Sequence, residues 1–270
     1  MSLWLNGKLL SAEAARLDPT DRGFTLGDGL FETIRIEDRW AAYLDRHLAR
    51  LRRGAAFLGI PLHWTDVEIE KGLNALLAAE GLKDAAIRIT LSRGPGPRGS
   101  LPPSVPTPTL VITAAGLAPP APPARVIIAT ITRRNEASPL SRLKTLNYLD
   151  NILARREASE RGADDAILLN TQGRVAEASV ANVFVLAGGA LKTPPIEDGA
   201  LPGIMRRALI EQCGAVEAAL LPADLADATA VFLSNSLGLR PVVAIDGKTI
   251  GDGRGPAAVA ELARIVLTAE

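Results

Sequence analysis

Lys144 lies where a Ser/Pro loop turns into an amphipathic segment, in the stretch SPLSRLKTLNYLDNILARREA at residues 138–158. A lysine held at the end of a rigid element, in a partly dry pocket, has a lowered pKa and can form a Schiff base. Most lysines in proteins are simply solvated, however. The type and position of this residue therefore permit covalent chemistry at Lys144 without requiring it.

The segment after Lys144 is predicted to form a helix that ends at Gly162, because its apolar residues recur at helical spacing. The residues expected on the packed side of this helix are Leu146, Leu149, Ile152 and Leu153. The pattern places Lys144 at the mouth of the helix, where a rigid element would hold it.

The rest of the chain predicts an α+β protein with mixed sheets in both halves. Apolar periodicity indicates helices at 42–60 and 67–81, and β-branched runs indicate strands at 31–38, 85–94 and 107–116. The first helix has a stripe made of Leu44, Leu48, Leu51, Ala55 and Leu58. Arg50 lies off this stripe, so periodicity alone makes it a solvated residue.

The second half begins after a Pro/Ala stretch at 117–123, which is typical of a short semi-rigid linker. We expect it to separate a small domain (1–116) from a large one (124–270). Two hairpins are predicted in the large domain, with turns at 171–173 and 188–189. A helix is expected to start near Pro202.

Composition limits the classes of function. The 30 basic and 30 acidic residues of the 270-residue chain cancel, whereas nucleic-acid and membrane-surface proteins usually carry a basic excess. One cysteine, Cys213, and two histidines argue against an intramolecular disulfide and a metal site. With no apolar run of about 20 residues and no signal-peptide pattern, we expect a cytoplasmic protein without nucleic-acid or membrane partners.

Six stretches, in order, resemble the class IV aminotransferase family, and the resemblance covers about residues 3–250. The stretches are RGFTLGDGLFETIRI (22–36), LSRGPGPRGSLPP (91–103), LKTLNYLDNILARREA (143–158), GRVAEASVANVFV (173–185), LKTPPIEDGALPGIMR (191–206) and FLSNSLGLRPV (232–242). This family includes branched-chain and D-amino-acid aminotransferases and 4-amino-4-deoxychorismate lyase. The resemblance implies a two-domain fold-type IV enzyme with pyridoxal 5′-phosphate as its cofactor.

The resemblance assigns residues to the cofactor. Lys144 falls where the family has its Schiff-base lysine, and Glu177 matches the carboxylate that keeps a proton on the pyridine nitrogen. By strand alternation alone, Glu177 would be an exposed hairpin residue. The residues implied for the phosphate and the ring are Arg50, the backbone amides of Ile204 and Met205, the loop residues Asn235 and Ser236, and Leu201 against the ring. Family aminotransferases often carry threonine where Met205 stands, so one hydroxyl is missing.

Substrate contacts separate the lyase from the transaminases, and three features resemble the lyase. Arg98, in the loop RGPGPRGS, suits bidentate capture of a carboxylate, although Ser100 stands where D-amino-acid aminotransferases have histidine. Asn235 could hold a substrate carboxylate or hydroxyl. Thr33, a catalytic candidate, stands where the lyase has a threonine thought to protonate the departing enolpyruvate. The alternative is that Thr33 is simply a β-branched residue of a strand. Phe31, two residues earlier, is a candidate for substrate binding.

The predicted activity is therefore conversion of 4-amino-4-deoxychorismate into 4-aminobenzoate and pyruvate, a step of folate biosynthesis. The alternative is a class IV aminotransferase that acts on D-amino acids or branched-chain L-amino acids with a 2-oxo acid acceptor, since the closing stretch AIDGKTIGDGRGP also fits branched-chain enzymes. A third possibility is a catalytically dead homologue. The resemblance further implies a homodimer that binds a small-molecule amine at the subunit and domain interface.

Overall fold

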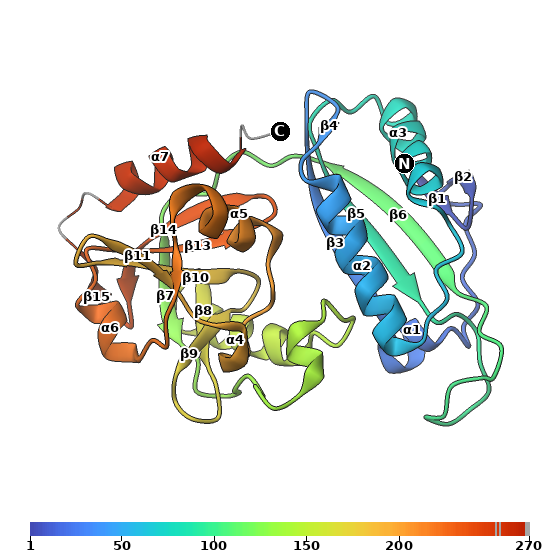
Figure 1. Cartoon of the computed structure of the whole chain (residues 1–270). Helices are drawn as coiled ribbons and strands as arrows, with labels where there is room; N and C mark the ends of the chain where they lie inside the picture. The colour runs from blue at the N-terminus through green and yellow to red at the C-terminus, as the bar shows by residue number, and fades with distance from the viewer. Residues whose placement is uncertain (252, 254, 268–270) are drawn as a thin grey trace. The chain divides into compact units, whose positions relative to one another are not determined.

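The computed structural model describes residues 1–251, 253 and 255–267, which fold into two compact units. One unit comprises Met1–Ala118 and the short segment Lys144–Asn147, and the other comprises Pro119–Leu143 and the residues from Tyr148 onward (Figure 1). Both contain helices and a β-sheet, so the prediction of an α+β protein is confirmed. The predicted end of the large domain, at residue 270, lies outside the described residues.

The first unit is built on a six-stranded antiparallel sheet with the order β2-β1-β6-β5-β3-β4. Its strands are β1 (Ser2–Leu5), β2 (Lys8–Ser11), β3 (Gly29–Glu37), β4 (Trp40–Ala41), β5 (Ala85–Ser92) and β6 (Thr109–Gly116). Its helices are α1 (Arg22–Leu26), α2 (Leu44–Leu58) and α3 (Asp66–Ala79). Helix α2 packs on β3, and α3 packs on β1 and β6 (Figure 1).

Helix α2 brings polar as well as apolar side chains into the interior. The middle of the predicted stripe, Leu48, Leu51 and Ala55, is buried as expected. Arg50 is also buried, however, with only 8% of its surface exposed. The inference from periodicity that Arg50 is solvated is therefore wrong. The guanidinium of Arg50 is buried because it donates two hydrogen bonds to the carboxylate of Glu32.

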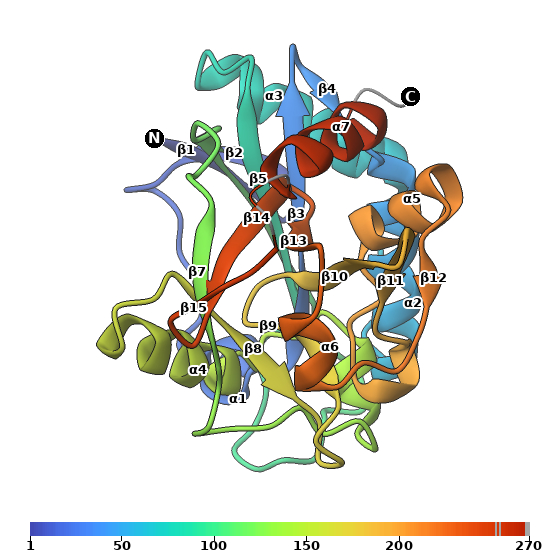
Figure 2. The ribbon, with the colours of Figure 1, turned by 90° about the vertical axis from the view of Figure 1, so that its left-hand side faces the viewer.

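The second unit contains a nine-stranded mixed sheet with the order β12-β11-β10-β13-β14-β7-β8-β9, and β15 pairs with β14. Its strands are β7 (Ala124–Ile128), β8 (Asp165–Leu169), β9 (Val175–Ala178), β10 (Asn182–Ala187), β11 (Ala190–Thr193), β12 (Val216–Glu217), β13 (Ala230–Asn235), β14 (Gly238–Ile245) and β15 (Lys248–Thr249). Its helices are α4 (Leu149–Glu160), α5 (Ile204–Cys213), α6 (Pro222–Ala226) and α7 (Gly255–Leu267), with 3-10 turns at Pro139–Arg142 and Ile196–Asp198. Figure 2 shows the parallel neighbours β7 and β14 side by side.

Both predicted hairpins of the second unit are present, as β8–β9 and β10–β11. The helix predicted after Lys144 differs from expectation. It begins only at Leu149, and Leu149 and Ile152 are exposed at 75% and 57%. Its buried side is instead made of Asn151, Ala154 and Ala158, because small side chains let α4 lie close to β8.

The loop after β5 depends on a glycine that no other residue can replace without a shift. Gly94 has a positive φ of 83°, and a Cβ added to it would lie 1.7 Å from the carbonyl oxygen of Thr107. Gly59 also has a positive φ, of 64°, but an added Cβ there meets nothing within 4 Å. Substituting Gly59 therefore measures the cost of a side chain at positive φ alone, whereas substituting Gly94 adds the cost of a steric clash.

We therefore expect Gly94→Ala to lower the free energy of unfolding by about 3 kcal/mol or more. Gly59→Ala should cost only about 1 kcal/mol, the conformational part. Urea unfolding followed by circular dichroism measures both. Equal losses in the two variants would show that the close approach to Thr107 is not a constraint.

Candidate active site

Backbone hydrogen bonds hold Lys144 against the beginning of β3. The amide of Phe31 donates to the carbonyl of Lys144 at 2.9 Å, and the amide of Leu146 donates to the carbonyl of Gly29 at 3.0 Å. Leu30 and Thr145 form an antiparallel bridge between them. Lys144 thus lies in an extended segment paired with the sheet of the first unit, five residues before α4 begins.

Side chains fasten the same segment. The amide of the Asn147 side chain donates to the carbonyl of Gly27 at 3.1 Å. A Cβ on Gly29 would lie 2.8 Å from a methyl carbon of Leu146 and 2.3 Å from the carbonyl oxygen of Leu91. Gly29 is therefore the residue that lets β5 and the Lys144 segment both approach β3 closely.

The Lys144 side chain lies over the ring of Phe31, with Nζ 4.3 Å from the ring centroid. Arg88, on the neighbouring strand β5, also stacks on this ring, with Cζ 3.8 Å from the centroid. Thr33 lies directly opposite Arg88 in the strand register and shares the face of Phe31, since residues two apart on a strand point the same way. One face of the first sheet thus brings Lys144, Phe31, Thr33 and Arg88 together.

The other face of β3 carries a buried charged triad. Both oxygens of Glu32 accept from Arg50, from Nε at 2.8 Å and from Nη2 at 2.7 Å, and His47 Nδ1 lies 2.6 Å from Oε2. Burial opposes the charge of Glu32, but the hydrogen bonds from Arg50 and His47 outweigh it and lower the pKa of Glu32 to about 2. Burial also lowers the pKa of His47. Glu32 therefore fixes the plane of the Arg50 guanidinium.

Arg98 lies apart from these contacts, exposed on the loop that follows β5. This loop continues into Ser100 and Leu101, which are exposed as well. A guanidinium presented on such a loop is accessible to a carboxylate from outside the unit.

In the second unit, Glu177 is buried on β9 rather than exposed. One oxygen accepts from the amide of Leu201 at 2.9 Å, and the other lies 3.0 Å from Nε of Arg134. Arg134 also donates to the carbonyl of Ser141 at 3.1 Å. Each oxygen of Glu177 is thus held by a nitrogen donor. The interpretation from strand alternation alone, that Glu177 is an exposed hairpin residue, is wrong.

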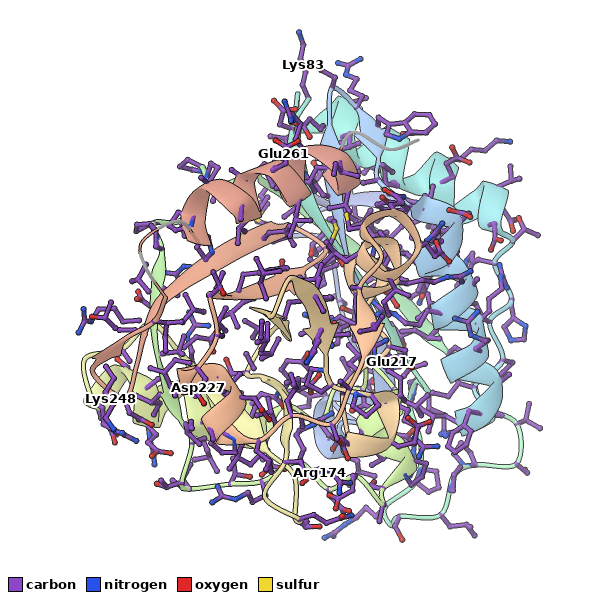
Figure 3. The ribbon with its side chains drawn as sticks, turned by 60° about the vertical axis from the view of Figure 1, so that its left-hand side comes forward. Lys83, Arg174, Glu217, Asp227, Lys248 and Glu261 are labelled. Atoms are coloured by element: carbon purple, nitrogen blue, oxygen red, sulfur yellow. The ribbon has the colours of Figure 1, made fainter. Side chains whose placement is uncertain are left out.

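The N-terminus of α5 is suited to a phosphate group. Its N-cap, Gly203, has no side chain to satisfy the first amides, and the first turn, with Ile204 and Met205, contains no acidic residue. A Cβ at Gly203 would lie 2.1 Å from Oδ1 of Asn182. Arg206 donates from Nη2 to the carbonyl of Pro194 and forms an ion pair with Glu217, which is labelled in Figure 3, while its buried Nε has no hydrogen-bond partner among the described residues.

The loop at the end of β13 lies beside the same helix terminus. Asn182 pairs with Ser234 in the register of β10 and β13, so the side chains of both point to one face. The hydroxyl of Ser234 is buried without a hydrogen-bond partner among the described residues. Asn235 and Ser236 follow directly, and Asn235 Oδ1 accepts from the amide of Leu237 at 2.9 Å. Bare amides and an unpartnered hydroxyl fit a phosphate ester.

The structure therefore divides the predicted residues between the two units. In the first unit, Lys144, Phe31 and Thr33 share one face of β3, Arg50 lies on the other face, and Arg98 lies apart on its loop. Sequence reasoning missed four neighbours: Glu32, His47, Arg88 and Arg134. Strand alternation could have found Glu32 and Arg88, because they lie next to Phe31 and across from Thr33. Nothing local in the sequence marks Arg134 as the partner of Glu177, which lies 43 residues away (177 − 134).

Within residues 1–251, 253 and 255–267, no group of three or more His, Cys, Asp or Glu residues is arranged to hold a metal ion. None of the helices described there is long and apolar enough to cross a membrane.

Comparison with known proteins defines the class. The family described as amino-transferase class IV matches residues 29–245. The branched-chain aminotransferase from Thermoproteus uzoniensis, solved with norvaline, superposes with a TM-score of 0.91 at 29% identity, over 100% of this chain and 96% of that one. The fold is thus fold type IV, as predicted. This chain belongs to the class IV aminotransferase family.

Curated relatives at similar distances carry different activities. The aminodeoxychorismate lyase of Bacillus subtilis is 33% identical over 212 residues, covering 77% of this chain and 72% of the relative. The D-alanine aminotransferase of Bacillus licheniformis is 30% identical over 259 residues, covering 94% and 91%. Enzymes of this family work with pyridoxal 5′-phosphate, so the predictions of an enzyme and of this cofactor are confirmed.

The buried triad makes a prediction about stability. Glu32→Gln leaves the charge of Arg50 buried without a carboxylate, so we expect it to lower the free energy of unfolding at pH 7 by about 3–5 kcal/mol. Glu37→Gln is the control, because its pair with Arg35 is exposed and such pairs contribute about 0–1 kcal/mol. Urea unfolding measures both. A loss in Glu32→Gln no larger than in the control would contradict the triad's contribution.

The same triad predicts a pH dependence. The pKa of Glu32 falls from its ordinary 4.5 in the unfolded chain to about 2 in the folded protein. A carboxyl with a lowered pKa contributes stability that is complete above the unfolded value and is lost as the pH falls towards the folded one. The difference in stability between wild type and Glu32→Gln should therefore shrink between about pH 4.5 and pH 2. A difference in the free energy of unfolding that stays constant over that pH range would contradict the lowered pKa of Glu32 as its cause.

Proposed function

We propose that this enzyme is a pyridoxal-phosphate-dependent lyase that converts 4-amino-4-deoxychorismate into 4-aminobenzoate and pyruvate. The observation that carries the proposal is the position of Thr33 on the face of β3 where Lys144 lies over Phe31. A hydroxyl there is suited to give a proton to departing enolpyruvate, a step that transamination does not need. The similarity to the Bacillus subtilis lyase supports the same assignment.

Each unit offers residues suited to part of the cofactor, which when bound supplies an electron sink through its protonated pyridine ring. Lys144 is the proposed attachment point, and Glu177 would hold the proton on the pyridine nitrogen. Leu201 would pack against the ring. The proposed phosphate donors are Arg50, the amides of Ile204 and Met205, and the loop residues Asn235 and Ser236. Without a hydroxyl at Met205, the first turn of α5 contributes backbone donors alone.

Lys144 and Thr33 divide the proton transfers of the lyase reaction. After the substrate amine displaces Lys144, the side-chain amine of Lys144 would remove the proton from the carbon that bears the substrate nitrogen. The neighbouring ether C–O bond breaks, its electron pair leaves with enolpyruvate, and the ring becomes aromatic. Enolpyruvate takes up a proton, donated through Thr33, and becomes pyruvate. Arg98, Asn235 and Phe31 are the proposed substrate contacts.

A transaminase with D-amino-acid or branched-chain L-amino-acid substrates and a 2-oxo acid acceptor is the second candidate. The 30% identity to the Bacillus licheniformis D-alanine aminotransferase over most of the chain favours it. In that reaction Lys144 would return the proton to the cofactor rather than leave elimination to proceed. Ser100, where D-amino-acid enzymes have histidine, counts against the D-amino-acid form.

We also propose a homodimer, in which the loop of Arg98 completes the site of the neighbouring subunit. Its support in this chain is the exposure of large apolar side chains near that loop, since Leu101 and Val105 are more than 80% exposed. The assignment of the second unit as the cofactor-binding domain and the cytoplasmic location stay predictions.

Replacing Lys144 tests the attachment point. In Lys144→Ala the absorbance band of the lysine-bound cofactor should disappear, and turnover should fall by about 10²–10⁴-fold or more, because the general base is lost with it. Lys83→Ala is the control, since Lys83 is an exposed lysine of the same unit (Figure 3). Spectra and rates of the purified holoenzymes decide. A Lys144→Ala protein that keeps the band would refute the site.

Product formation tests the reaction. The holoenzyme is supplied with 4-amino-4-deoxychorismate, made in situ from chorismate and glutamine by the upstream synthase, and 4-aminobenzoate is followed by fluorescence. We expect enzyme-dependent product, a fall in kcat of about 10²–10⁴-fold in Thr33→Val, and recovery in Thr33→Ser, which restores the hydroxyl. No product from a cofactor-loaded enzyme that transaminates amino acids would establish the second candidate instead.

A further inference from the structure

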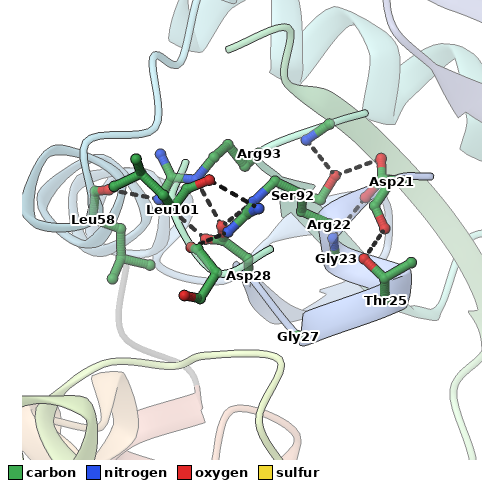
Figure 4. Close-up of polar contacts among 12 residues, drawn as sticks. Asp21, Arg22, Gly23, Thr25, Gly27, Asp28, Leu58, Ser92, Arg93 and Leu101 are labelled. Atoms are coloured by element: carbon green, nitrogen blue, oxygen red, sulfur yellow. Dashed lines mark hydrogen bonds and ion pairs between the residues drawn. The ribbon is translucent and has the colours of Figure 1, made fainter. Parts of the chain in front are cut away.

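Arg22 is a buried arginine whose guanidinium is surrounded by the loop that bears Arg98. It donates from Nη1 to the carbonyl of Gly99 at 2.9 Å and from Nη2 to that of Ser100 at 2.7 Å. Nη1 also lies 3.4 Å from the carbonyl oxygen of Leu101 (Figure 4). Only 3% of Arg22 is exposed. Three successive carbonyls, directly after Arg98, thus converge on one side chain.

Asp28 balances this charge and shares it with a second arginine. Its Oδ2 accepts from Nε of Arg22 at 2.8 Å and from Nε of Arg93 at 2.7 Å (Figure 4). Burial would raise the pKa of Asp28, but the hydrogen bonds from Arg93 and Arg22 outweigh it and lower that pKa. Asp28 therefore stays charged and holds both guanidinium groups in place.

Arg93 connects this carboxylate to helix α2. Its Nη1 and Nη2 donate to the carbonyls of Gly59 and Leu58, at 2.9 and 2.8 Å, at the C-terminal end of the helix. Cationic groups are favourable there, because the helix dipole leaves partial negative charge on the last carbonyls. The loop is thus anchored, through Arg22 and Asp28, to a rigid helix that also carries Arg50.

The backbone of the loop fits closely around Arg22. A Cβ on Gly96 would lie 2.9 Å from Cδ and 3.3 Å from Cγ of Arg22. The amide of Arg22 also donates to the carbonyl of Gly94 at 2.9 Å. The side chains at the loop tip are exposed, so apolar burial does not hold the tip in shape. The arginine and its carbonyl contacts provide that restraint.

We propose that Arg22 is a positioning residue for substrate binding: it holds the loop so that Arg98 is presented to a carboxylate of the amine substrate. The identity of that ligand rests on the proposed function, while the restraint on the loop does not. A structural role alone would not require this chemistry, because buried ion pairs are often replaceable by apolar residues at no loss of stability. Three directed carbonyl contacts specify a backbone shape instead.

The first test is steady-state kinetics of the holoenzyme with its amine substrate. Arg22→Lys keeps the charge but cannot reach three carbonyls, so we expect KM to rise about tenfold or more with kcat changed less than about threefold. Gly96→Ala, which presses on the Arg22 side chain without removing any charge, should shift KM in the same direction. Arg16→Lys is the control, since Arg16 is exposed and donates to the carbonyls of nearby Glu13 and Ala15.

A double-mutant cycle separates positioning from general damage. If Arg22 acts through Arg98, Arg22→Lys should add less than about twofold to KM once Arg98→Ala is present. The cofactor absorbance should be unchanged in every variant. An equal rise in KM in both backgrounds, or a loss of bound cofactor, would overturn the proposal.

Tryptic cleavage reads the loop without any substrate. The bond between Arg98 and Gly99 is exposed, and its cleavage is detected by mass as a fragment that ends at Arg98. Release of the loop in Arg22→Lys should raise the cleavage rate about tenfold, because proteolysis follows local opening. Faster cleavage with unchanged KM would overturn the substrate role, and unchanged cleavage would overturn the restraint. A holoenzyme that turns over no amine substrate would contradict the proposed function. The rate of tryptic cleavage would still show whether Arg22 restrains the loop.

Discussion

The antiparallel pairing between the Lys144 segment and the start of β3 is the constraint on which the site depends. It uses only backbone groups of Gly29, Phe31, Lys144 and Leu146, so the lysine side chain stays available to lie over the Phe31 ring. A side chain at Gly29 would strike Leu91 of β5 and Leu146 together. The strand can therefore accept a neighbour on each edge here only because this position has no Cβ.

Strand alternation then separates two kinds of chemistry on β3. Phe31 and Thr33 point to the face of Lys144, while Glu32, between them, points into α2 and binds Arg50 and His47. Removing a buried carboxylate that has two nitrogen partners is costly, and while present it holds both partner side chains in fixed orientations. The orientation of the predicted phosphate arginine and the placement of the predicted proton donor are consequently fixed by consecutive residues of a single strand.

Sequence reasoning gave the α+β class and the hairpins, because turn residues and strand periodicity are local signals. It gave the wrong packed face for α4, where Ala154 and Ala158 are buried and Leu149 is exposed. Hydropathy ranks leucine above alanine, whereas close contact with β8 selects for size. Periodicity and strand alternation alone likewise make Arg50 and Glu177 exposed, since a buried charge is recognisable only once its partner is known, whereas the family resemblance assigns both to the cofactor. Those partners, Glu32 and Arg134, come from other elements.

In the proposed mechanism the lyase and the transaminase share the removal of a proton by Lys144, so the lysine does not distinguish the two reactions. The two reactions differ in the step that follows, because the lyase breaks the ether bond and the transaminase does not. Elimination needs a proton donor near the leaving group and a firmly held substrate carboxylate. The residues proposed for these two roles, Thr33 and Arg98, lie on β3 and on the loop after β5. Thr33 stands on β3 opposite Arg88 of β5, and Arg22 donates to the carbonyls of Gly99 and Ser100 in the loop. In this proposal the reaction changes through these two supports while the cofactor chemistry stays the same, which agrees with the comparable identities, 33% and 30%, of relatives that carry different activities.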